Sequence, residues 1–296
     1  MVDLSSREEW ARVEQYLQQP LEEPVRLVSA TPLTESTRAA PWRLDVEMGG
    51  SAHAYVLWLD SRRMEHEYEV LRAMEAVPIP TPRAYGWDPE GEALGVPSFF
   101  CDFVEGESLL AYMLAGETWA EELYIKTVCA LQAVTWEQLA PVAHRFSQGE
   151  TAADWLEMVY GHFQANPNAL ADAVYERLQE TMPPLPEPRF SNGDLWPDNL
   201  LVRDRRLAGV IDFEGAGFTD PIYEFLLPFF LRPALRDRGL EKRYCQRMGF
   251  DAASLPWYHA LEYFDTWAWT LRSGESFEQH TEASCRAALE RWLVDG

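Results

Sequence analysis

The chain has little positive charge, and lysine is nearly missing from it. Its 296 residues include 25 lysines and arginines against 48 aspartates and glutamates, which gives a formal net charge of −23. Its only lysines are Lys126 and Lys242. Because polyphosphate backbones attract proteins through basic surfaces, this balance argues against a nucleic-acid-binding protein. It would suit a cationic partner or a metal-bound one.

Cysteine and long apolar runs are also scarce. No CxxC pair occurs, so neither a zinc ribbon nor a disulfide framework is indicated, and we expect buried, reduced thiols in a cytoplasmic protein. The most apolar stretch, residues 225–231, is interrupted by Pro228 and is too short to span a bilayer. The first residues have no basic region followed by an apolar core, so we expect a soluble protein without a membrane partner.

Apolar and aromatic residues are plentiful. They make up 47% and 13% of the chain, which excludes general disorder and allows a sizeable core. The first third contains short stretches with strand character and one charged helix near residues 62–75. After Gly106, apolar residues recur at the three- and four-residue spacing of helices. The pattern predicts an α+β fold with two domains: residues 1–104, built on a small antiparallel sheet, and residues 105–296, mainly helical.

The segment 191–221 interrupts the helical part and is the most informative stretch of the chain. Two short apolar runs around a polar turn, together residues 200–211, predict an antiparallel hairpin. A hairpin returns the chain to its starting point. Asn199, just before the hairpin, should therefore lie close to Asp212, just after it, and Asp194 lies within loop reach.

These three side chains suggest metal-assisted chemistry. Asn199 and Asp212 offer hard oxygen ligands of the kind that Mg²⁺ takes, and Mg²⁺ usually leaves its other positions to water and substrate phosphates. Asp194 could then orient an attacking hydroxyl and accept its proton. The alternative is that all three are ordinary turn or capping residues. Their convergence at this spacing favours the metal-site interpretation.

The segment resembles the catalytic and metal-binding loops of the aminoglycoside phosphotransferase and choline kinase superfamily, small-molecule kinases with a protein-kinase-like fold. The family pattern is His-Gly-Asp, four residues, Asn, a hairpin ending in Ile-Asp-Trp/Phe-Glu, and then Asp-Pro. The matching residues are Asn192-Gly193-Asp194, Asn199, Ile211-Asp212-Phe213-Glu214 and Asp220-Pro221. The resemblance implies a bilobal fold, with a small N-terminal lobe and a large helical C-terminal lobe that carries both loops. It also implies that Asp194 is the catalytic base and that Asn199 and Asp212 are metal ligands, with ATP or GTP and Mg²⁺ as cofactors.

The resemblance further implies a nucleotide site in the first lobe. A glycine turn would cover the phosphates, a helix glutamate would match the one that pairs with the family's phosphate-binding lysine, and a hinge would bond adenine through a carbonyl and an N–H group. The residues in these roles are Gly49, Gly50 and Ser51; Glu67; and Asp102 and Val104. The alternatives are an ordinary hairpin turn, a solvated helix carboxylate and a buried strand that ends at a glycine.

The chain departs from the family pattern in three places. Trp58 stands where the strand lysine is expected, and either it faces the nucleotide or it packs against the sheet or the following helix. Arg62 and Arg63, at the start of that helix, are the candidates for supplying the missing charge. Asn192 replaces the loop histidine, and its amide can make similar hydrogen bonds. Gln132 stands where many relatives have a histidine, which we interpret as a structural substitution.

Two functional hypotheses follow from these matches and departures. The first is an ATP-dependent phosphotransferase that acts on a hydroxyl of a small molecule, and the second is a pseudokinase-like nucleotide- or ligand-binding module without turnover. Glu214, Tyr223 and Asp265 are candidates for the acceptor site, and acidic and aromatic side chains suit a cationic substrate such as an aminoglycoside or an amino alcohol. A neutral sugar or nucleoside remains an alternative. The expected partner is a small molecule rather than nucleic acid, and the expected assembly is a monomer or a homodimer.

Overall fold

The computed structural model describes residues 4, 7–33, 41–61, 63–146, 149–164, 168–236 and 238–295. Contacts divide the chain into two compact units. The sheet unit contains Met1–Ser108, Trp136–Arg145 and Asn199–Ala216, and the helical unit contains Leu109–Thr135, Phe146–Asp198 and Gly217–Gly296. We had expected one boundary at residues 104 and 105. The contacts instead place residues 136–145 and 199–216, which include the hairpin, with the sheet unit.

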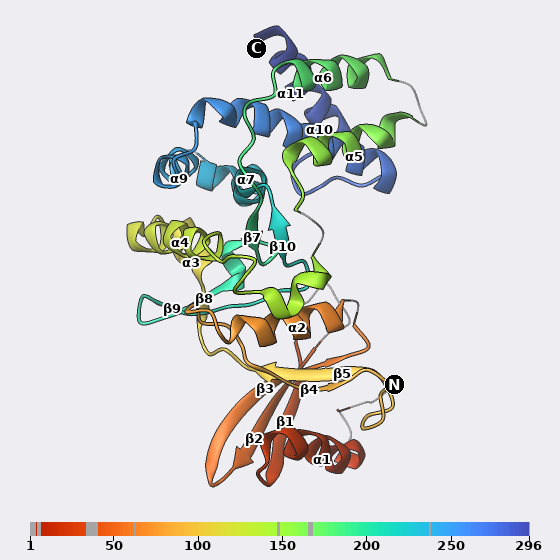
Figure 1. The fold of residues 1–296 in the computed structure, drawn as a ribbon, viewed down its shortest axis with the longest axis vertical. Helices are drawn as coiled ribbons and strands as arrows, with labels where there is room; N and C mark the ends of the chain where they lie inside the picture. Colours follow the sequence, from red (N-terminus) through yellow and green to blue (C-terminus); the bar gives the residue numbers. More distant parts are fainter. Residues whose placement is uncertain are drawn as a thin grey trace. The chain divides into compact units, whose positions relative to one another are not determined.

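The sheet unit is built on a five-stranded antiparallel sheet with the order β1-β2-β3-β5-β4 (Figure 1). The strands are β1 (Val25–Pro32), β2 (Trp42–Met48), β3 (Ser51–Leu59), β4 (Ala84–Asp88) and β5 (Ser98–Asp102). Each of them overlaps a stretch in which the sequence indicated a strand. The small antiparallel sheet of the expected N-terminal lobe is therefore confirmed.

Helix α1 (Trp10–Leu21) covers one face of this sheet. Val13, Tyr16 and Leu17 lie three and four residues apart, so they share one side of the helix. They pack in a core with strand residues such as Leu44 and Leu57, all 5% exposed or less. Burial of each such side chain contributes about 1.5–3 kcal/mol, so this core fixes the position of the sheet on which the later contacts depend.

Helix α2 (Met64–Met74) packs on the sheet unit through a second aromatic cluster. Trp58 of β3 stacks on Phe99 of β5, with ring centroids 6.4 Å apart and an interplanar angle of 15°. Tyr68 of α2 meets the same Phe99 ring edge-on at 5.8 Å. Trp58 and Leu57 are adjacent in a strand, where successive side chains point to opposite faces. This alternation gives Leu57 to the α1 core and Trp58 to the α2 side.

A three-stranded sheet, β6-β8-β9, completes the sheet unit. Its strands are β6 (Glu107–Ser108), β8 (Leu200–Arg203) and β9 (Arg206–Val210). Asp204 and Arg205 form the two-residue turn between β8 and β9 and have φ values of +52° and +58°. Two positive φ values are typical of the turn whose twist matches antiparallel strands. The predicted hairpin is confirmed.

The helical unit consists of helices around one small sheet, β7-β10, which pairs Arg189–Ser191 with Gly217–Thr219. Its main helices are α3 (Leu109–Leu114), α4 (Thr118–Leu131), α5 (Ala152–Gln164), α6 (Ala169–Glu180), α7 (Pro221–Leu231), α8 (Pro233–Arg236), α9 (Leu240–Met248), α10 (Leu255–Ser273) and α11 (Glu282–Asp295). Trp267 of α10 is fully buried, and Phe264 stacks on Phe163 of α5 at 4.9 Å. The aromatic residues of α10 thus form the core that holds α5 and α10 together.

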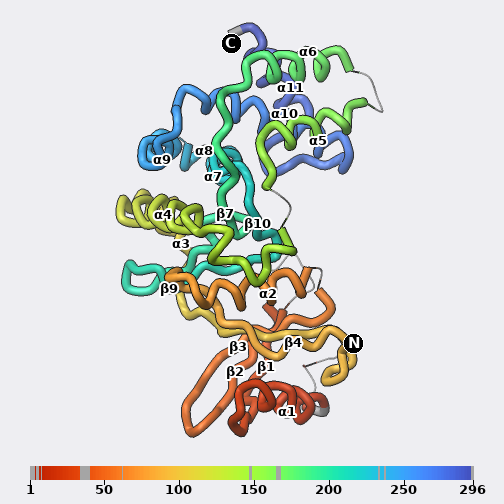
Figure 2. Tube along the Cα trace, in the orientation of Figure 1, coloured from red at the N-terminus to blue at the C-terminus, as the bar shows by residue number. Residues whose placement is uncertain are grey.

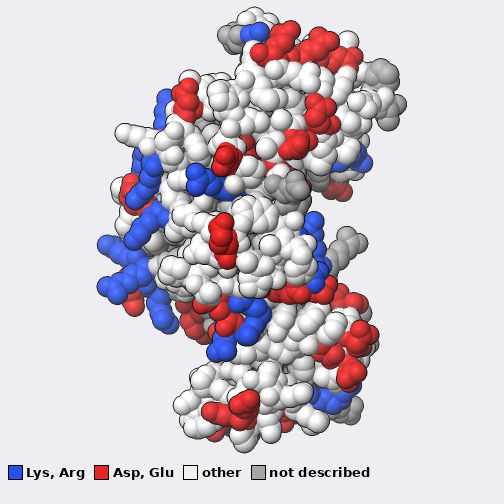
Figure 3. Space-filling view, in the orientation of Figure 1, with Lys and Arg blue, Asp and Glu red and all other residues white. Residues whose placement is uncertain are grey.

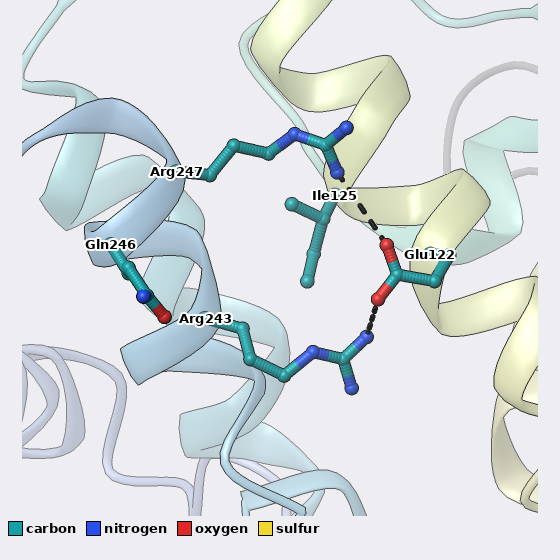
Figure 4. Close-up of a pocket in the computed structure, with 5 residues that line it drawn as sticks. All are labelled: Glu122, Ile125, Arg243, Gln246 and Arg247. Atoms are coloured by element: carbon teal, nitrogen blue, oxygen red, sulfur yellow. Dashed lines mark hydrogen bonds and ion pairs between the residues drawn. The ribbon is translucent and has the colours of Figure 1, made fainter.

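Ion pairs join α4 to α9 at the surface of the helical unit. Arg243 of α9 contacts Glu121 at 3.0 Å. It also contacts Glu122, from which Arg247 lies 3.5 Å away, and Figure 4 shows both of these pairs. A hollow of about 290 Å³ lies between these side chains and is floored by Ile125. On the face drawn in Figure 3, acidic and basic side chains are both scattered, and the largest group of basic side chains lies at the left edge. The arginines of α9 are thus held by neighbouring glutamates.

The structure also bears on the cysteines and on membrane-spanning helices. All four cysteines are free thiols, and Cys101, Cys245 and Cys285 are buried. Within the described ranges, none of the helices combines the length and the apolar composition needed to cross a bilayer.

Candidate active site

The β8–β9 hairpin brings Asn199 and Asp212 to the same end of the small sheet. Leu200 pairs with Val210, and beyond this pair the N–H of Ile211 donates to the carbonyl of Asn199 at 2.9 Å. Asp212 is therefore the first residue after a backbone bond to Asn199. Both side chains are half-buried, so they remain accessible to a ligand. The sequence prediction that these two residues lie together is confirmed by this register.

Asp212 has an unusual backbone conformation. Its φ is +61°, in the left-handed region that residues with a side chain rarely adopt. Aspartate tolerates this region better than most residues do, and such conformations persist only where the surroundings hold them. The N–H of Phe213, the next residue, donates to Oε1 of Glu67 at 3.4 Å. The backbone of Asp212 is thus bonded on both sides.

Two residues of α2 and the residue that caps its N-terminus contact the backbone after Asp212. Figure 2 shows the chain after β9 passing along this helix. Besides Glu67, His66 Nε2 lies 2.8 Å from the carbonyl of Ala216, and Arg63 Nη1 lies 3.5 Å from the carbonyl of Glu214. Burial lowers the pKa of His66, and its hydrogen bond with the Ala216 carbonyl opposes this shift. Because a carbonyl oxygen only accepts, the Nε2–H group of His66 is the donor in this bond.

The position expected for the phosphate-binding lysine is occupied by an apolar contact. Trp58 is 9% exposed and stacks on Phe99, so it packs within the sheet unit, as one of the two interpretations predicted. Arg62 lies outside the described residues. Arg63, which caps α2 with a φ of +56°, reaches the carbonyl of Glu214, two residues after Asp212.

The predicted phosphate turn joins β2 to β3. Gly49 and Gly50 have φ values of +57° and +80°, and Ser51 pairs with Met48 across the turn. A Cβ atom at Gly49 would lie 3.3 Å from Oε2 of Glu23. A larger side chain at Gly49 would thus crowd Glu23, and phosphate binding by this turn stays a prediction.

The predicted hinge begins where β5 ends. The carboxylate of Asp102 accepts hydrogen bonds from the N–H of Arg83 at 3.2 Å and from the Tyr85 hydroxyl at 3.1 Å. Val104 packs against Gly209 of β9, where a Cβ atom would lie only 3.0 Å from a Val104 methyl group. The segment after β5 is thus fixed against the hairpin that carries Asp212.

Asp194 lies in the helical unit, in a loop fixed by hydrogen bonds. Asn192, fully buried, donates from Nδ2 to the carbonyl of Asp194 at 3.0 Å, and the N–H of Gly193 donates to Oγ of Ser191 at 2.9 Å. The Tyr124 hydroxyl donates to the carbonyl of Leu195 at 2.7 Å. Asn192 thus holds the loop backbone, in keeping with the prediction that an asparagine can bond as a histidine does. Asp194 itself is half-buried.

Glu224 of α7 lies beside this loop. Oγ of Ser191 donates to Oε2 of Glu224 at 3.2 Å. Burial raises the pKa of Glu224 to about 7, the bond from Ser191 opposes this rise, and the negative charge of Asp194 adds to it. A carboxyl group that titrates near neutrality therefore lies next to the predicted catalytic base.

A second group of carboxylates lies among aromatic rings in the same unit. Asp265 of α10 accepts hydrogen bonds from the Tyr223 hydroxyl at 3.1 Å and from Nε1 of Trp155 at 3.2 Å. Glu262, one turn earlier, is 2% exposed. Burial raises the pKa of both acids, and the charges of Asp265 and Glu224 raise that of Glu262 further. Tyr223 and Asp265, two of the predicted acceptor residues, are thus bonded to each other, whereas Glu214 belongs to the sheet unit.

The Asp-Pro pair at residues 220–221 starts α7 and so positions Tyr223. Oδ1 of Asp220 accepts from the N–H groups of Ile222 and Tyr223 at 2.9 and 3.0 Å, and Oδ2 accepts from the Tyr258 hydroxyl at 2.9 Å. Gln132 donates to the carbonyl of Pro221 at 3.1 Å and accepts from a second buried tyrosine. Gln132 therefore has the structural role that we predicted.

The donor set at the hairpin fits Mg²⁺. Asn199 provides an amide oxygen and Asp212 a carboxylate, and Mg²⁺ takes such oxygens while keeping further positions for water and phosphate. In the part of the chain that the structure describes, no group of three histidine, cysteine, aspartate or glutamate side chains is arranged to hold a metal. Asn199 and Asp212 together offer one amide oxygen and one carboxylate, and these two residues would hold the ion.

A comparison with protein families identifies the fold and the general chemistry. Residues 48–258 match the model of a family described as the phosphotransferase enzyme family. The chain belongs to this family. Residues 192–221, which carry the resemblance in the sequence, lie within the matched region, and the resemblance to aminoglycoside phosphotransferases is confirmed.

Solved structures of phosphotransferases share the fold over nearly the whole chain. An aminoglycoside phosphotransferase homologue from Ralstonia eutropha has a TM-score of 0.71 at 16% identity, covering 96% of this chain and 97% of its own. APH(4)-Ia in complex with AMP-PNP and hygromycin B has a TM-score of 0.65 at 16% identity, with coverages of 96% and 98%. APH(2″)-IIIa with GDP and kanamycin gives 0.61 at 17% identity, with coverages of 95% and 98%. The predicted protein-kinase-like fold is confirmed.

Sequence reasoning overlooked how several residues of the site are held. The contact of Glu224 with Ser191 could not be predicted, because it depends on tertiary packing. His66 and Glu262 gave no signal, because a histidine and a glutamate inside charged or amphipathic helices look like solvated residues. The Asp-Pro pair at residues 220–221 was a local signal for the start of α7.

Proposed function

We propose that this member of the family is a nucleotide- and Mg²⁺-dependent phosphotransferase that acts on a hydroxyl group of a small molecule. The observation that carries the proposal is the backbone bond between Ile211 and Asn199, which holds the two oxygen ligands Asn199 and Asp212 at one end of a hairpin. The family match gives this pair its context. The structural relatives that were solved with AMP-PNP or GDP support either ATP or GTP as the donor.

The proposed roles follow from the chemistry of each side chain. Asn199 and Asp212 would hold Mg²⁺, which when bound neutralises charge that builds up on transferred phosphate oxygens. Asp194 would orient the acceptor hydroxyl and take up its proton. Asp102 and Val104 would bind the adenine or guanine base through their backbone groups. The turn 49–51 would cover the nucleotide phosphates.

The acceptor is proposed to be a cationic hydroxyl compound, such as an aminoglycoside or an amino alcohol. Asp265 places a half-buried carboxyl group in the helical unit, and Trp155 and Tyr223 place aromatic rings beside it. Carboxylates and aromatic faces both attract ammonium groups. Relatives of the same fold were solved with hygromycin B and kanamycin, which are compounds of this class.

Release of ADP or GDP in the presence of Mg²⁺ and a panel of hydroxyl compounds tests this function. The panel pairs amino sugars and amino alcohols with neutral sugars and nucleosides of similar size. We expect turnover with cationic members, and loss of about 10²–10⁴-fold in rate for Asp194→Asn, as is usual for removal of a general base. Turnover restricted to neutral compounds would refute the proposed acceptor class.

The metal role is tested by a pair of variants in the same hairpin. Asp212→Asn should weaken Mg²⁺-dependent nucleotide binding more than Asp194→Asn does. Asp204→Asn is the matched control, because Asp204 also has a positive φ but lies exposed in the turn between β8 and β9. Equal affinities in the Asp212 and Asp194 variants would contradict the role assignment.

A specific observation supports a second candidate, a module that binds nucleotide without turnover. Trp58 places an aromatic ring where the family pattern has a phosphate-binding cation. Measurable nucleotide binding with no release of diphosphate for any member of the panel would favour this module over the enzyme.

A further inference from the structure

We propose that Glu67 is a positioning residue that fixes the backbone at Asp212 for metal binding, instead of pairing with a strand lysine. This inference rests on the proposed function, because it assigns a role within the same metal site. Both lysines of the chain belong to the helical unit. The residue at the expected lysine position of β3 is Trp58, whose ring stacks on Phe99.

The contact of Glu67 lies next to Asp212 in the sequence. Glu67 is 3% exposed, and its Oε1 accepts the N–H of Phe213 at 3.4 Å. On the other side of Asp212, the N–H of Ile211 donates to Asn199 at 2.9 Å. The left-handed backbone of Asp212 is therefore held between two hydrogen bonds, one of which runs to the other proposed metal ligand and one to α2. The direction of the Asp212 carboxylate depends on both bonds.

The α2 side chains that contact this loop include both hydrogen-bond donors and an acceptor. Arg63 and His66 are donors, and they lie against the carbonyls of Glu214 and Ala216. Glu67 is an acceptor, and it lies against an N–H group. Each side chain thus matches the backbone group that it faces. Among these three contacts, only that of Glu67 involves the residue adjacent to Asp212.

Other residues of α2 are fixed elsewhere. Glu69 makes a two-pronged ion pair with Arg145, at 2.6 and 2.9 Å, and Glu65 shares the same guanidinium. These contacts hold the helix to η2 (Ala140–Arg145) and do not involve the Asp212 loop. Glu69 is therefore a matched control: it is a carboxylate on the same helix, two residues away, with a different partner.

Hydrogen exchange of the Phe213 amide, measured on the full chain without nucleotide, tests the contact directly. Glu67→Ala removes the acceptor, whereas Glu67→Gln keeps an oxygen at the same position. We expect exchange about tenfold faster in Glu67→Ala, the change for loss of one bond to a charged acceptor, and near-normal exchange in Glu67→Gln. Glu69→Ala should leave Phe213 exchange unchanged.

Mg²⁺ titration of nucleotide binding supplies a readout of position rather than of general stability. Glu67→Ala should require more Mg²⁺ for half-maximal binding, Glu67→Gln should restore the wild-type requirement, and Glu69→Ala should not change it. Normal exchange and normal Mg²⁺ requirement in Glu67→Ala would overturn the proposal. So would equal damage from the Gln and Ala substitutions, which would indicate a role of the charge, or equal damage from Glu69→Ala, which would indicate a loosened helix.

Failure of the proposed function would look different. If the wild-type protein binds no nucleotide at any Mg²⁺ concentration, the metal site and its positioning by Glu67 are both refuted, whatever the exchange result. If the wild-type protein binds nucleotide with Mg²⁺ but Phe213 exchange is unaffected by Glu67→Ala, the metal site stands and the positioning role alone is refuted.

Discussion

The pH dependence of stability offers a sharp test of the environment of Glu224. This side chain accepts a hydrogen bond from Ser191, next to the Asp194 loop, and burial raises its pKa from 4.5 to about 7. Replacing it by glutamine gives a side chain of similar shape that stays neutral at every pH. The difference in unfolding free energy between wild type and Glu224→Gln therefore isolates the ionisation of this one group.

The sign and size of the effect follow from the raised pKa. Because the folded protein binds this proton more tightly than the unfolded chain does, the stabilisation is complete below about pH 4.5 and is lost as the pH rises through about 7. At about 1.4 kcal/mol per pH unit, the wild type should lose at most about 3 kcal/mol relative to the glutamine variant across this window. The side chain is only half-buried, so solvent screening makes this value an upper limit.

Urea unfolding of both proteins at several pH values measures this difference, with the denaturant slope checked for constancy. Asp194→Asn provides a second arm. Since the charge of Asp194 contributes to the raised pKa of Glu224, its removal should shift the transition to lower pH. A difference between wild type and Glu224→Gln that stays flat from below pH 4.5 to above pH 7 would refute the reasoning.

Three further substitutions test the packing around the site, each by denaturant unfolding. Asp220→Ala removes the cap of α7 and leaves the buried Tyr258 hydroxyl without its acceptor, so we expect the free energy of unfolding to fall by about 2–4 kcal/mol. Asp220→Asn should lower it clearly less, and equal losses in the two variants would contradict the capping role. Gly209→Ala places a Cβ atom 3.0 Å from a Val104 methyl group, and should lower the free energy of unfolding by about 1–2 kcal/mol. A stabilised variant would show that the segment around Val104 can move away without loss of stability. Trp267→Ala empties a fully buried site in α10, and should cost about 3–5 kcal/mol; a loss below about 1 kcal/mol would show that α10 does not hold the core.

Local patterns predicted much of the secondary structure. The strands of the main sheet and the β8–β9 hairpin were readable because apolar runs alternate with turn residues over a few positions, and such patterns depend on near neighbours. The closeness of Asn199 and Asp212 followed from the hairpin alone, since an antiparallel pair must return to its start. The spacing of apolar residues did not show where each helix ends: α4 ends at Leu131, and the next side chain, Gln132, makes buried hydrogen bonds with Pro221 and Tyr244.

Contacts between distant segments could not be predicted in the same way. Glu67 looks like any helix carboxylate, and it meets Phe213 only because α2 packs beside the end of β9. Glu224 and Ser191 are 33 residues apart, and their bond arises from the packing of α7 against β7. The grouping of the hairpin with the sheet unit likewise depends on long-range contacts.

The sequence by itself determined which chemical groups this protein has available: an asparagine and an aspartate at the two ends of one hairpin, an aspartate in the loop before it, and no lysine on the strand. Residue type and residue spacing within short segments determine these properties. Only the tertiary structure decided what surrounds those groups, from the burial that raises the pKa of Glu224 to the α2 carboxylate that bonds beside Asp212. Burial and hydrogen bonding between distant segments arise from packing, and packing involves the whole chain at once.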